Sequence, residues 1–220
     1  MEEMLVIALP KGRLLDPSIH LLKGLGILPK GLTESSRRLI HDAEKKGVRV
    51  LLVRAVDVAT YVEYGAADMG IAGKDLLLEQ MRDVYEPVDL VYGSCKVVLA
   101  QPEPKEKGLA SAQVEKASHQ TKLRIATKYP NITERYFSEK GMPIEIVKLY
   151  GSIELAPLVG LADQIVDLSS SGETLRAHNL TVVEELVQCS ARLIVNRASL
   201  RLKYPRIQNM IDSIKKAVKS

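Results

Sequence analysis

One short segment of the chain, from Asp167 to Thr174, combines the residue types that bind a small anion. An apolar run ends in Asp167, and hydroxyl residues and Gly172 follow before a helical stretch that contains Leu175. In such a turn, backbone N–H groups converge on one anion, hydroxyls add donors, and the start of a helix supplies positive potential. A phosphate monoester can therefore bind without a basic side chain. The candidate phosphate-binding residues are Ser169, Ser170, Ser171, Gly172, Glu173 and Thr174.

Two acidic side chains are expected near this anion. Asp167, at the tip of the strand, is placed to accept hydrogen bonds from sugar hydroxyls beside the phosphate, or to hold a metal ion through water. Glu154 is a candidate for the same roles, and alternatively a favourable acid in a first helical turn. The loop has a plainer interpretation too, as a polar turn in which Ser171 or Thr174 caps a helix.

Basic side chains follow the predicted strands of the first half. Lys11 and Arg13 come directly after the first strand, and Arg54 ends another. Arginine suits phosphate oxygens because its planar fork binds two of them at once. We therefore expect these three side chains to contact the oxygens of a polyphosphate. Arg37 is a fourth candidate, although Arg37 and Arg38 are equally compatible with a solvated pair.

The elements that must position these residues alternate as in an α/β protein. In the first half, apolar runs of strand length alternate with segments of helical period; the expected strands are 5–9, 48–53 and 69–72, and the expected helices are 16–25 and 58–64. The same order restarts after Lys122, with strands 123–127, 144–149 and 164–168 and helices 132–140 and 154–161. The expected fold class is α/β, with two similar lobes.

Short motifs recur at equivalent places in the two halves. Gly65-Ala66-Ala67-Asp68 precedes an apolar strand and a glycine-containing turn, and Gly160-Leu161-Ala162-Asp163 does the same. A lysine, Lys11 or Lys128, also follows the first strand of each half. This shared order indicates an internal duplication. We expect the two aspartates to be turn acids or caps, whereas Lys128 is compatible with a phosphate contact or with a surface lysine.

The expected lobes comprise residues 1–93 with 196–220, and residues 94–195. The apolar runs 96–100 and 191–195 are expected to cross between the lobes, so that the C-terminal helix, 204–218, packs on the first lobe. The predicted ligand cleft lies between the lobes, at the carboxyl ends of strands. A charged, proline-punctuated surface loop is expected over 102–108 and a short amphipathic helix over 110–118.

The composition excludes several classes of function. With 46% hydrophobic and 26% charged residues, the chain has the balance of a soluble globular protein. A net charge of +4, one phenylalanine and no tryptophan give no support to nucleic-acid binding. No apolar run approaches the roughly 20 residues that span a bilayer, and the acidic start does not resemble a secretory signal, so we expect a cytoplasmic protein. The scattered histidines and the distant Cys95 and Cys189 predict neither a zinc site nor a disulfide.

Four segments together resemble the ATP phosphoribosyltransferase family. Residues 160–175 are similar to its signature segment, and residues 8–14, 54–75 and 125–133 resemble further stretches of it. The likeness covers nearly the whole chain and is weakest over 102–122 and the last helix. The common type I phosphoribosyltransferases carry two adjacent acids where this chain has only Asp167, which argues against their fold. The phosphate loop of P-loop proteins and the dinucleotide fingerprint are both absent from the sequence.

The resemblance implies a periplasmic-binding-protein-like (type II) fold with two lobes. It also implies transfer of the phosphoribosyl group of phosphoribosyl pyrophosphate to N1 of ATP, which gives phosphoribosyl-ATP and pyrophosphate in the first step of histidine biosynthesis. Its short form implies a homodimer of catalytic chains that joins a histidyl-tRNA-synthetase-like regulatory subunit in a hetero-octamer inhibited by histidine. The alternatives are a non-catalytic small-anion-binding protein of the same two-lobe fold and a scaffold subunit.

The resemblance and the residue patterns together assign roles within that reaction. Mg²⁺ is expected as a cofactor that the substrates carry, with no direct protein ligands. The expected catalytic residues are Lys11, Arg13, Arg37, Arg54 and Asp167. Phosphoribosyl pyrophosphate is expected to contact Glu154, Asp167, Ser169, Ser170, Ser171, Gly172, Glu173 and Thr174. ATP is expected to contact Lys11 and Gly12, and also Gly73, Lys74 and Asp75, which occupy the position in the first half that corresponds to the 167–174 loop.

Overall fold

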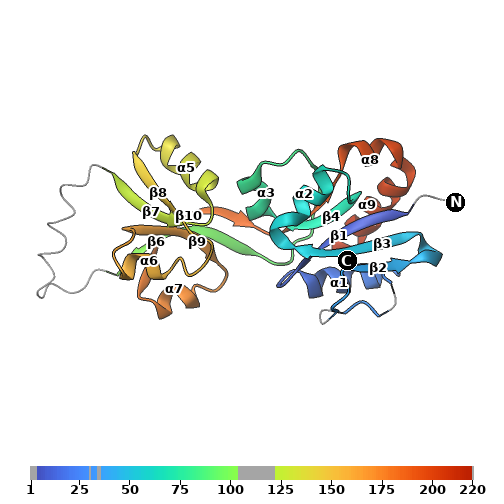
Figure 1. The fold of residues 1–220 in the computed structure, drawn as a ribbon, viewed down its shortest axis with the longest axis horizontal. Coiled ribbons are helices and arrows are strands. Elements are labelled where there is room, and N and C mark those ends of the chain that lie inside the picture. The colour runs from blue at the N-terminus through green and yellow to red at the C-terminus, as the bar shows by residue number, and fades with distance from the viewer. Residues whose placement is uncertain (1–3, 30, 34–35, 104–121, 220) are drawn as a thin grey trace, which may run out of the picture. The chain divides into compact units, whose positions relative to one another are not determined.

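The computed structural model describes residues 4–29, 31–33, 36–103 and 122–219. These residues form two compact α/β units, one made of residues 1–94 and 189–220 and the other of residues 95–188. Figure 1 shows both units with their elements labelled. The short helix expected over 110–118 lies outside the described residues, as does most of the loop expected after Pro102.

Unit 1 is built on a six-stranded sheet in the order β2-β3-β1-β4-β11-β5. Strands β1 and β3 pair in parallel, as do β1 and β4, while β11 runs antiparallel to both β4 and β5. The strands are β1 Leu5–Lys11, β2 Ile40–Ala43, β3 Val48–Arg54, β4 Met69–Gly73, β5 Tyr85–Asp89 and β11 Ala191–Val195. The helices are α1 Leu15–Gly24, α2 Val58–Glu63, α3 Lys74–Gln80, α8 Arg197–Leu202 and α9 Tyr204–Lys219, with short 3₁₀ turns η1 Glu44–Lys46 and η2 Ala55–Asp57.

Helices cover both faces of this sheet because its strands are apolar on both sides. Alternate residues of a strand point to opposite faces. Leu5, Ile7 and Leu9 of β1 accordingly join the cluster that contains α1 and α9, while Ala8 joins the cluster that contains α2. Helix α9 buries three isoleucines, Ile207, Ile211 and Ile214, in the first cluster. The expected packing of the C-terminal helix on the first lobe is therefore confirmed.

Unit 2 is built on a five-stranded sheet in the order β10-β6-β9-β7-β8. Strand β7 pairs in parallel with β8 and β9, and β6 runs antiparallel to β9. Helix α5 lies on one side of the sheet, and α6 and α7 lie on the other (Figure 1). The strands are β6 Cys95–Pro102, β7 Leu123–Thr127, β8 Ile144–Lys148, β9 Gln164–Ser169 and β10 Leu180–Cys189; the helices are α5 Pro130–Glu139, α6 Leu155–Leu158 and α7 Glu173–Ala177.

The strand orders confirm the duplication that the sequence predicts. The five strands β3-β1-β4-β11-β5 of unit 1 correspond in order to β8-β7-β9-β6-β10 of unit 2, and β11 and β6 are the antiparallel neighbours of β4 and β9. The glycines of the repeated motif also agree, because Gly65 has φ +75° and Gly160 has φ +74°. Both residues need a left-handed conformation that glycine adopts without strain.

One domain boundary differs from the expected one. Residues 191–195 were expected in the second lobe, yet β11 pairs with β4 and β5 and so belongs to unit 1. The chain passes between the units next to Cys95 and next to Cys189. The run 96–100 likewise lies within the sheet of unit 2 as part of β6. An apolar run identifies a buried strand, but its partners decide which sheet it joins.

Helix α6 is shorter than the expected helix 154–161. It ends at Leu158 because the left-handed Gly160 turns the chain away. The Gly160 N–H donates to the carbonyl of Pro157, and the Leu161 N–H donates to that of Ala156. This pair of bonds is the Schellman pattern that closes a helix at a glycine.

Candidate functional site

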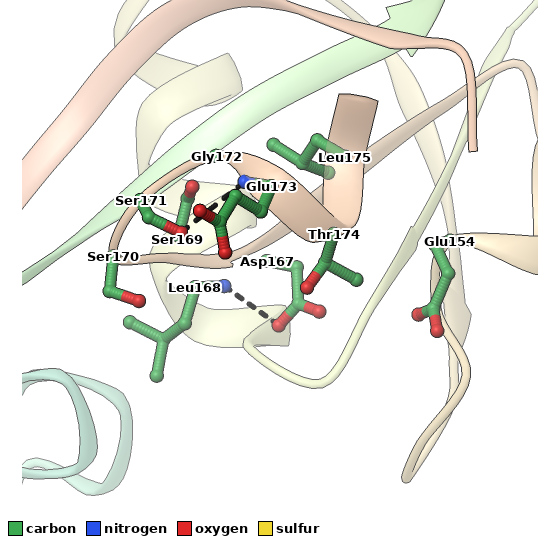
Figure 2. A pocket seen from close by; sticks show the side chains of 10 residues that line it. All are labelled: Glu154, Asp167, Leu168, Ser169, Ser170, Ser171, Gly172, Glu173, Thr174 and Leu175. Atoms are coloured by element: carbon green, nitrogen blue, oxygen red, sulfur yellow. Dashed lines mark hydrogen bonds between the residues drawn. The ribbon is translucent and has the colours of Figure 1, made fainter. Parts of the chain in front are cut away.

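A pocket in unit 2 gathers the residues of the predicted anion loop. It has a volume of about 190 Å³, smaller than the roughly 300–1,000 Å³ of pockets that enclose drug-sized ligands. The space therefore suits a phosphate group with part of its sugar. Nine of the lining residues are consecutive, from Asp167 to Leu175, and Figure 2 shows Glu154 on a separate segment. The lining residues are Glu154, Asp167, Leu168, Ser169, Ser170, Ser171, Gly172, Glu173, Thr174 and Leu175.

The loop has a fixed start and a fixed end. It begins at the tip of β9, which lies between β6 and β7 in the sheet. It ends at α7, where Leu175 is buried in the core of unit 2. Gly172 takes φ +75° directly before the helix, and the Arg176 side chain donates to the Ser171 carbonyl at 3.1 Å. The strand and the helix therefore determine the path of the three residues between them, Ser170, Ser171 and Gly172.

Several donors of the loop have no acceptor within the described part of the chain. These are the backbone N–H groups of Ser170, Ser171 and Gly172. The Ser171 hydroxyl accepts the Glu173 N–H at 3.4 Å, but the N-cap of α7 is Gly172, so neither Ser171 nor Thr174 is the cap that the plainer interpretation expects. That bond uses one hydroxyl and leaves the three N–H groups available. Exposed turn N–H groups next to a helix start are the donors with which proteins bind phosphate.

Asp167 is held by two donors at the edge of this pocket. Its Oδ1 accepts the Leu168 N–H at 2.7 Å and lies 2.9 Å from Nζ of Lys128. The Asp167 side chain is only 18% exposed, and that of Lys128 is 36% exposed. Residue Lys128 is absent from the expected site residues, although the repeat places it after the first strand of its lobe. Lys128 can be recognised once β7 and β9 are known to pair in parallel. Thr127 then lies beside Val166, and the next residues, Lys128 and Asp167, are neighbours.

The pocket lining is acidic rather than basic. Glu154, Asp167 and Glu173 contribute three carboxylates, and no lysine or arginine is among the lining residues. Lys128 and Arg176 lie at its margin through their contacts with Asp167 and Ser171. Among the residues that the structure describes, no group of three or more His, Cys, Asp or Glu side chains forms a metal site.

The structure brings the basic candidates of unit 1 to one end of its sheet. Lys11 is the last residue of β1 and pairs in register with Arg54, the last residue of β3. Arg13 follows within the β1–α1 turn, in which Gly12 has φ +92°. Strand β2 runs antiparallel to β3, with Ile40 opposite Leu51, so the residues just before β2, including Arg37, also lie at this end. The side chains of Lys11, Arg13, Arg37 and Arg54 are all exposed.

Gly73, Lys74 and Asp75 lie where β4 passes into α3, the position that corresponds to the β9–α7 loop. This segment differs from the β9–α7 loop in that it carries a lysine held in an ion pair: Lys74 Nζ lies 2.7 Å from Oε2 of Glu86. Arg192 approaches the other oxygen of Glu86 at 3.4 Å. Asp75 is buried, and its carboxylate lies against Gly73, where a Cβ would meet Oδ1 at 2.3 Å. A larger residue at position 73 would therefore force the Asp75 carboxylate to move.

Known proteins resemble this chain from end to end. The sequence model of the family described as HisG, ATP phosphoribosyltransferase, matches residues 54–216. An ATP phosphoribosyltransferase of Geobacter metallireducens is 51% identical over 218 residues, which cover 99% of this chain and 100% of the relative. A protein of Geobacter sulfurreducens named ATP phosphoribosyltransferase 2 is also 51% identical, with the same coverage.

Solved structures agree with the sequence matches. A chain of the ATP phosphoribosyl transferase (HisG:HisZ) complex from Thermotoga maritima superposes with a TM-score of 0.81 at 32% identity, covering 98% of this chain and 99% of that one. The alkanesulfonate-binding protein SsuA from Xanthomonas axonopodis has a TM-score of 0.55 at 14% identity, covering 99% of this chain and 74% of that one. This second likeness concerns the fold alone and confirms the periplasmic-binding-protein-like fold. The chain belongs to the ATP phosphoribosyltransferase family.

Proposed function

We propose that this chain transfers the phosphoribosyl group of phosphoribosyl pyrophosphate to N1 of ATP, in the first step of histidine biosynthesis. N1 forms a bond to the anomeric carbon of the ribose, the bond from that carbon to pyrophosphate breaks, and pyrophosphate leaves with the electron pair. Family membership supports the reaction. The observation that supports the site is the grouping of Asp167, Glu154 and the Ser/Gly/Thr loop in one pocket.

The loop binds the 5-phosphate of phosphoribosyl pyrophosphate in this proposal. The N–H groups of Ser170, Ser171 and Gly172 supply donors, and the hydroxyls of Ser169 and Thr174 add to them. Glu173 contributes its backbone at the start of α7. No lysine or arginine lines the pocket. The loop is therefore expected to bind a single phosphate ester, with several backbone N–H groups each donating a hydrogen bond to its oxygens.

Asp167 and Glu154 bind the ribose hydroxyls. A carboxylate accepts a hydroxyl hydrogen bond, and bonds to charged groups contribute about 1.5–3 kcal/mol each. The two carboxylates face the pocket from different segments (Figure 2). They can therefore hold neighbouring hydroxyls of one sugar and orient the anomeric carbon for attack, which is the main requirement of this reaction.

Lys11, Arg13, Arg37 and Arg54 stabilise the anionic groups of the reaction. Negative charge accumulates on the leaving pyrophosphate in the transition state, and positioned cations lower the barrier there more than they strengthen substrate binding. The in-register pairing of Lys11 with Arg54 places two of these cations side by side. Lys11, Gly12, Gly73, Lys74 and Asp75 contact ATP in this proposal, and Lys74 must leave Glu86 to do so.

Mg²⁺ is the cofactor in this proposal and arrives with the substrate phosphates. Magnesium is commonly held by one or two carboxylates together with phosphate oxygens. Glu154 and Asp167 line the pocket and can contact the water molecules of the hydrated ion without ligating it directly. Bound to pyrophosphate, the ion would neutralise charge on the leaving group.

The assembly is proposed from the family. The Thermotoga maritima relative is a HisG:HisZ complex. We infer that this chain is the short catalytic form, which works in the cytoplasm as a homodimer and joins a HisZ-type regulatory subunit in a hetero-octamer. Within the described residues, no helix is long and apolar enough to cross a membrane.

The test is the formation of the adduct and of pyrophosphate by the purified chain with Mg²⁺, with and without a HisZ-type subunit. The proposal predicts product only when ATP and phosphoribosyl pyrophosphate are both present. It also predicts inhibition by histidine that requires the regulatory subunit. If either ligand binds but no mixture gives product, the chain is an anion-binding protein of this fold instead.

A further inference from the structure

The strongest unassigned feature of the pocket is the contact of Lys128 with Asp167. Lys128 comes from the end of β7, and Asp167 from the tip of β9, so the contact joins two parallel neighbours of the sheet. The distance of 2.9 Å allows a charge-assisted hydrogen bond. Since Lys128 does not line the pocket, its effect on a ligand there would act through Asp167.

The backbone that carries Lys128 is fixed by buried hydrogen bonds on both sides. The Thr127 hydroxyl donates to the carbonyl of Val166 at 2.7 Å and accepts the Tyr129 N–H at 2.9 Å. Thr127 is fully buried and Tyr129 is 2% exposed. The Thr133 hydroxyl in turn donates to the Tyr129 carbonyl at 2.7 Å. Lys128 therefore starts from a rigid point next to the strand that carries Asp167.

The contact determines which carboxylate oxygen is available to a ligand. Both the Leu168 N–H and Lys128 Nζ approach Oδ1 of Asp167. Within the described part of the chain, Oδ2 has no donor. Two donors on one oxygen fix the rotation of the carboxylate, so that Oδ2 is the oxygen left to accept a hydroxyl hydrogen bond.

The contact also lowers the negative charge at the pocket. Three carboxylates line the space that is proposed to take up a phosphate ester. Lys128 pairs with one of them, and its ammonium group also lies 5.2 Å from the centroid of the Tyr129 ring. Without Lys128, an incoming phosphate would meet a stronger repulsion from Asp167, because no lysine or arginine lines the pocket.

We infer that Lys128 is a positioning residue for phosphoribosyl pyrophosphate: it holds the Asp167 carboxylate so that Oδ2 receives the ribose hydroxyl. This inference rests on the proposed binding of that substrate in the pocket. It concerns binding of one substrate and leaves the ATP contacts unchanged. Its effect should therefore fall on the KM for phosphoribosyl pyrophosphate.

The test compares Lys128→Met with Lys128→Arg. The methionine variant keeps an unbranched side chain that is one heavy atom shorter, and it removes the charge. It should raise the KM for phosphoribosyl pyrophosphate by about tenfold or more, because the charge-assisted hydrogen bond from the ribose hydroxyl to Asp167 depends on the orientation that Lys128 maintains. The KM for ATP and the unfolding midpoint should stay near wild type. The arginine variant should recover most of the loss, since it restores a donor to Asp167.

A matched control is Lys140→Met. Lys140 Nζ lies 2.6 Å from Oε2 of Glu184 in the same unit, and neither residue lines the pocket. This variant removes an equal charge and a similar ion pair, so it should leave both KM values unchanged. Equal effects of Lys128→Met and Lys140→Met on the KM for phosphoribosyl pyrophosphate would overturn the inference.

A double-mutant cycle with Asp167→Asn separates positioning from direct contact. If Lys128 acts through Asp167, adding Lys128→Met to Asp167→Asn should cost less than twofold more. Fully additive losses would overturn the inference, because Lys128 would then act on the substrate itself. An inactive wild-type chain, or an Asp167→Asn variant with unchanged kinetics, would instead contradict the proposed function. A loss in Asp167→Asn with none in Lys128→Met would contradict only the role of Lys128.

Discussion

Asp68 and Asp163 make the same hydrogen bonds in the two units. Asp68 Oδ2 accepts the Val6 N–H of β1 at 2.8 Å, and Asp163 Oδ2 accepts the Arg124 N–H of β7 at 2.8 Å. Each aspartate also donates its own backbone N–H to the carbonyl of its partner: Asp68 to that of Val6, and Asp163 to that of Arg124. The repeated Gly-x-Ala-Asp motif thus ties the start of one strand to the start of its parallel neighbour, and the structure gives both acids a turn role, as expected.

The two aspartates should differ in their effect on stability. The Asp68 side chain is 6% exposed and also lies 3.1 Å from Lys203 Nζ, whereas the Asp163 side chain is 32% exposed. Asp68→Ala removes the ion pair with Lys203 and the acceptor of the Val6 N–H, so it should cost about 3 kcal/mol of unfolding free energy. Asp163→Ala should cost about 1 kcal/mol. Urea unfolding followed by circular dichroism measures both, and an equal or larger loss in Asp163→Ala would contradict this account.

Gly172→Ala tests the conformation of the phosphate loop. An alanine at φ +75° is strained by about 1–2 kcal/mol, which should shift the loop and raise the KM for phosphoribosyl pyrophosphate by about tenfold. Gly141→Ala is the matched control, because Gly141 has φ +66°, an added Cβ there meets no atom within 4 Å, and the residue lies outside the pocket. Steady-state kinetics should show the KM change only at Gly172. The same change in both variants would mean that general strain, not the loop, is responsible.

Arg54→Ala should lower turnover far more than it weakens binding of phosphoribosyl pyrophosphate. The proposed charge on the leaving pyrophosphate exists mainly in the transition state, so kcat should fall by about tenfold to a hundredfold. Arg49 lies on the same strand and pairs with Asp42 at 2.6 Å, and Arg49→Ala serves as the control with unchanged kcat. Full turnover in Arg54→Ala would remove Arg54 from the mechanism.

Stability should fall at high pH because of Tyr92. Burial raises the pKa of this phenol from 10.0 to about 12, while the hydrogen bond with Ser18 lowers it. The raised folded-state pKa means that its stabilising contribution is complete below pH 10 and is lost as pH rises from 10 to 12. That loss is about 2–3 kcal/mol. Tyr92→Phe should flatten the curve in this window, and Tyr150→Phe, at a residue 88% exposed, should not. Parallel losses in wild type and Tyr92→Phe would refute the assignment to Tyr92.

The sequence predicts most of the strands because they are apolar runs in a buried sheet. β7 begins and ends as expected, and β1, β3, β4 and β9 extend one or two residues further than expected. β10 was missed because it shows neither a continuous apolar run nor an alternation of apolar and polar residues. Its residues from Thr181 to Glu185 are all exposed, so no buried face imposes such a pattern on them. The short β2 and β5 also escaped prediction, as did the short helix α8, whose cap is Asn196.

The candidate site was predictable where its residues are consecutive. The run from Asp167 to Thr174 lines one pocket because a strand, a turn and a helix follow one another along the chain. The Lys128–Asp167 contact was not predictable, since it depends on which strands are neighbours in the sheet. The pairing of Lys74 with Glu86 was missed for the same reason.

The kinetics of Asp167→Asn test the central claim most directly. Adduct formation is measured with Mg²⁺ while phosphoribosyl pyrophosphate is varied at saturating ATP, and then the reverse. We predict a fall of about tenfold to a hundredfold in kcat/KM for phosphoribosyl pyrophosphate, because the amide replaces a charged acceptor at the ribose, with the KM for ATP unchanged. Wild-type kinetics for both substrates in Asp167→Asn would show that phosphoribosyl pyrophosphate binds elsewhere.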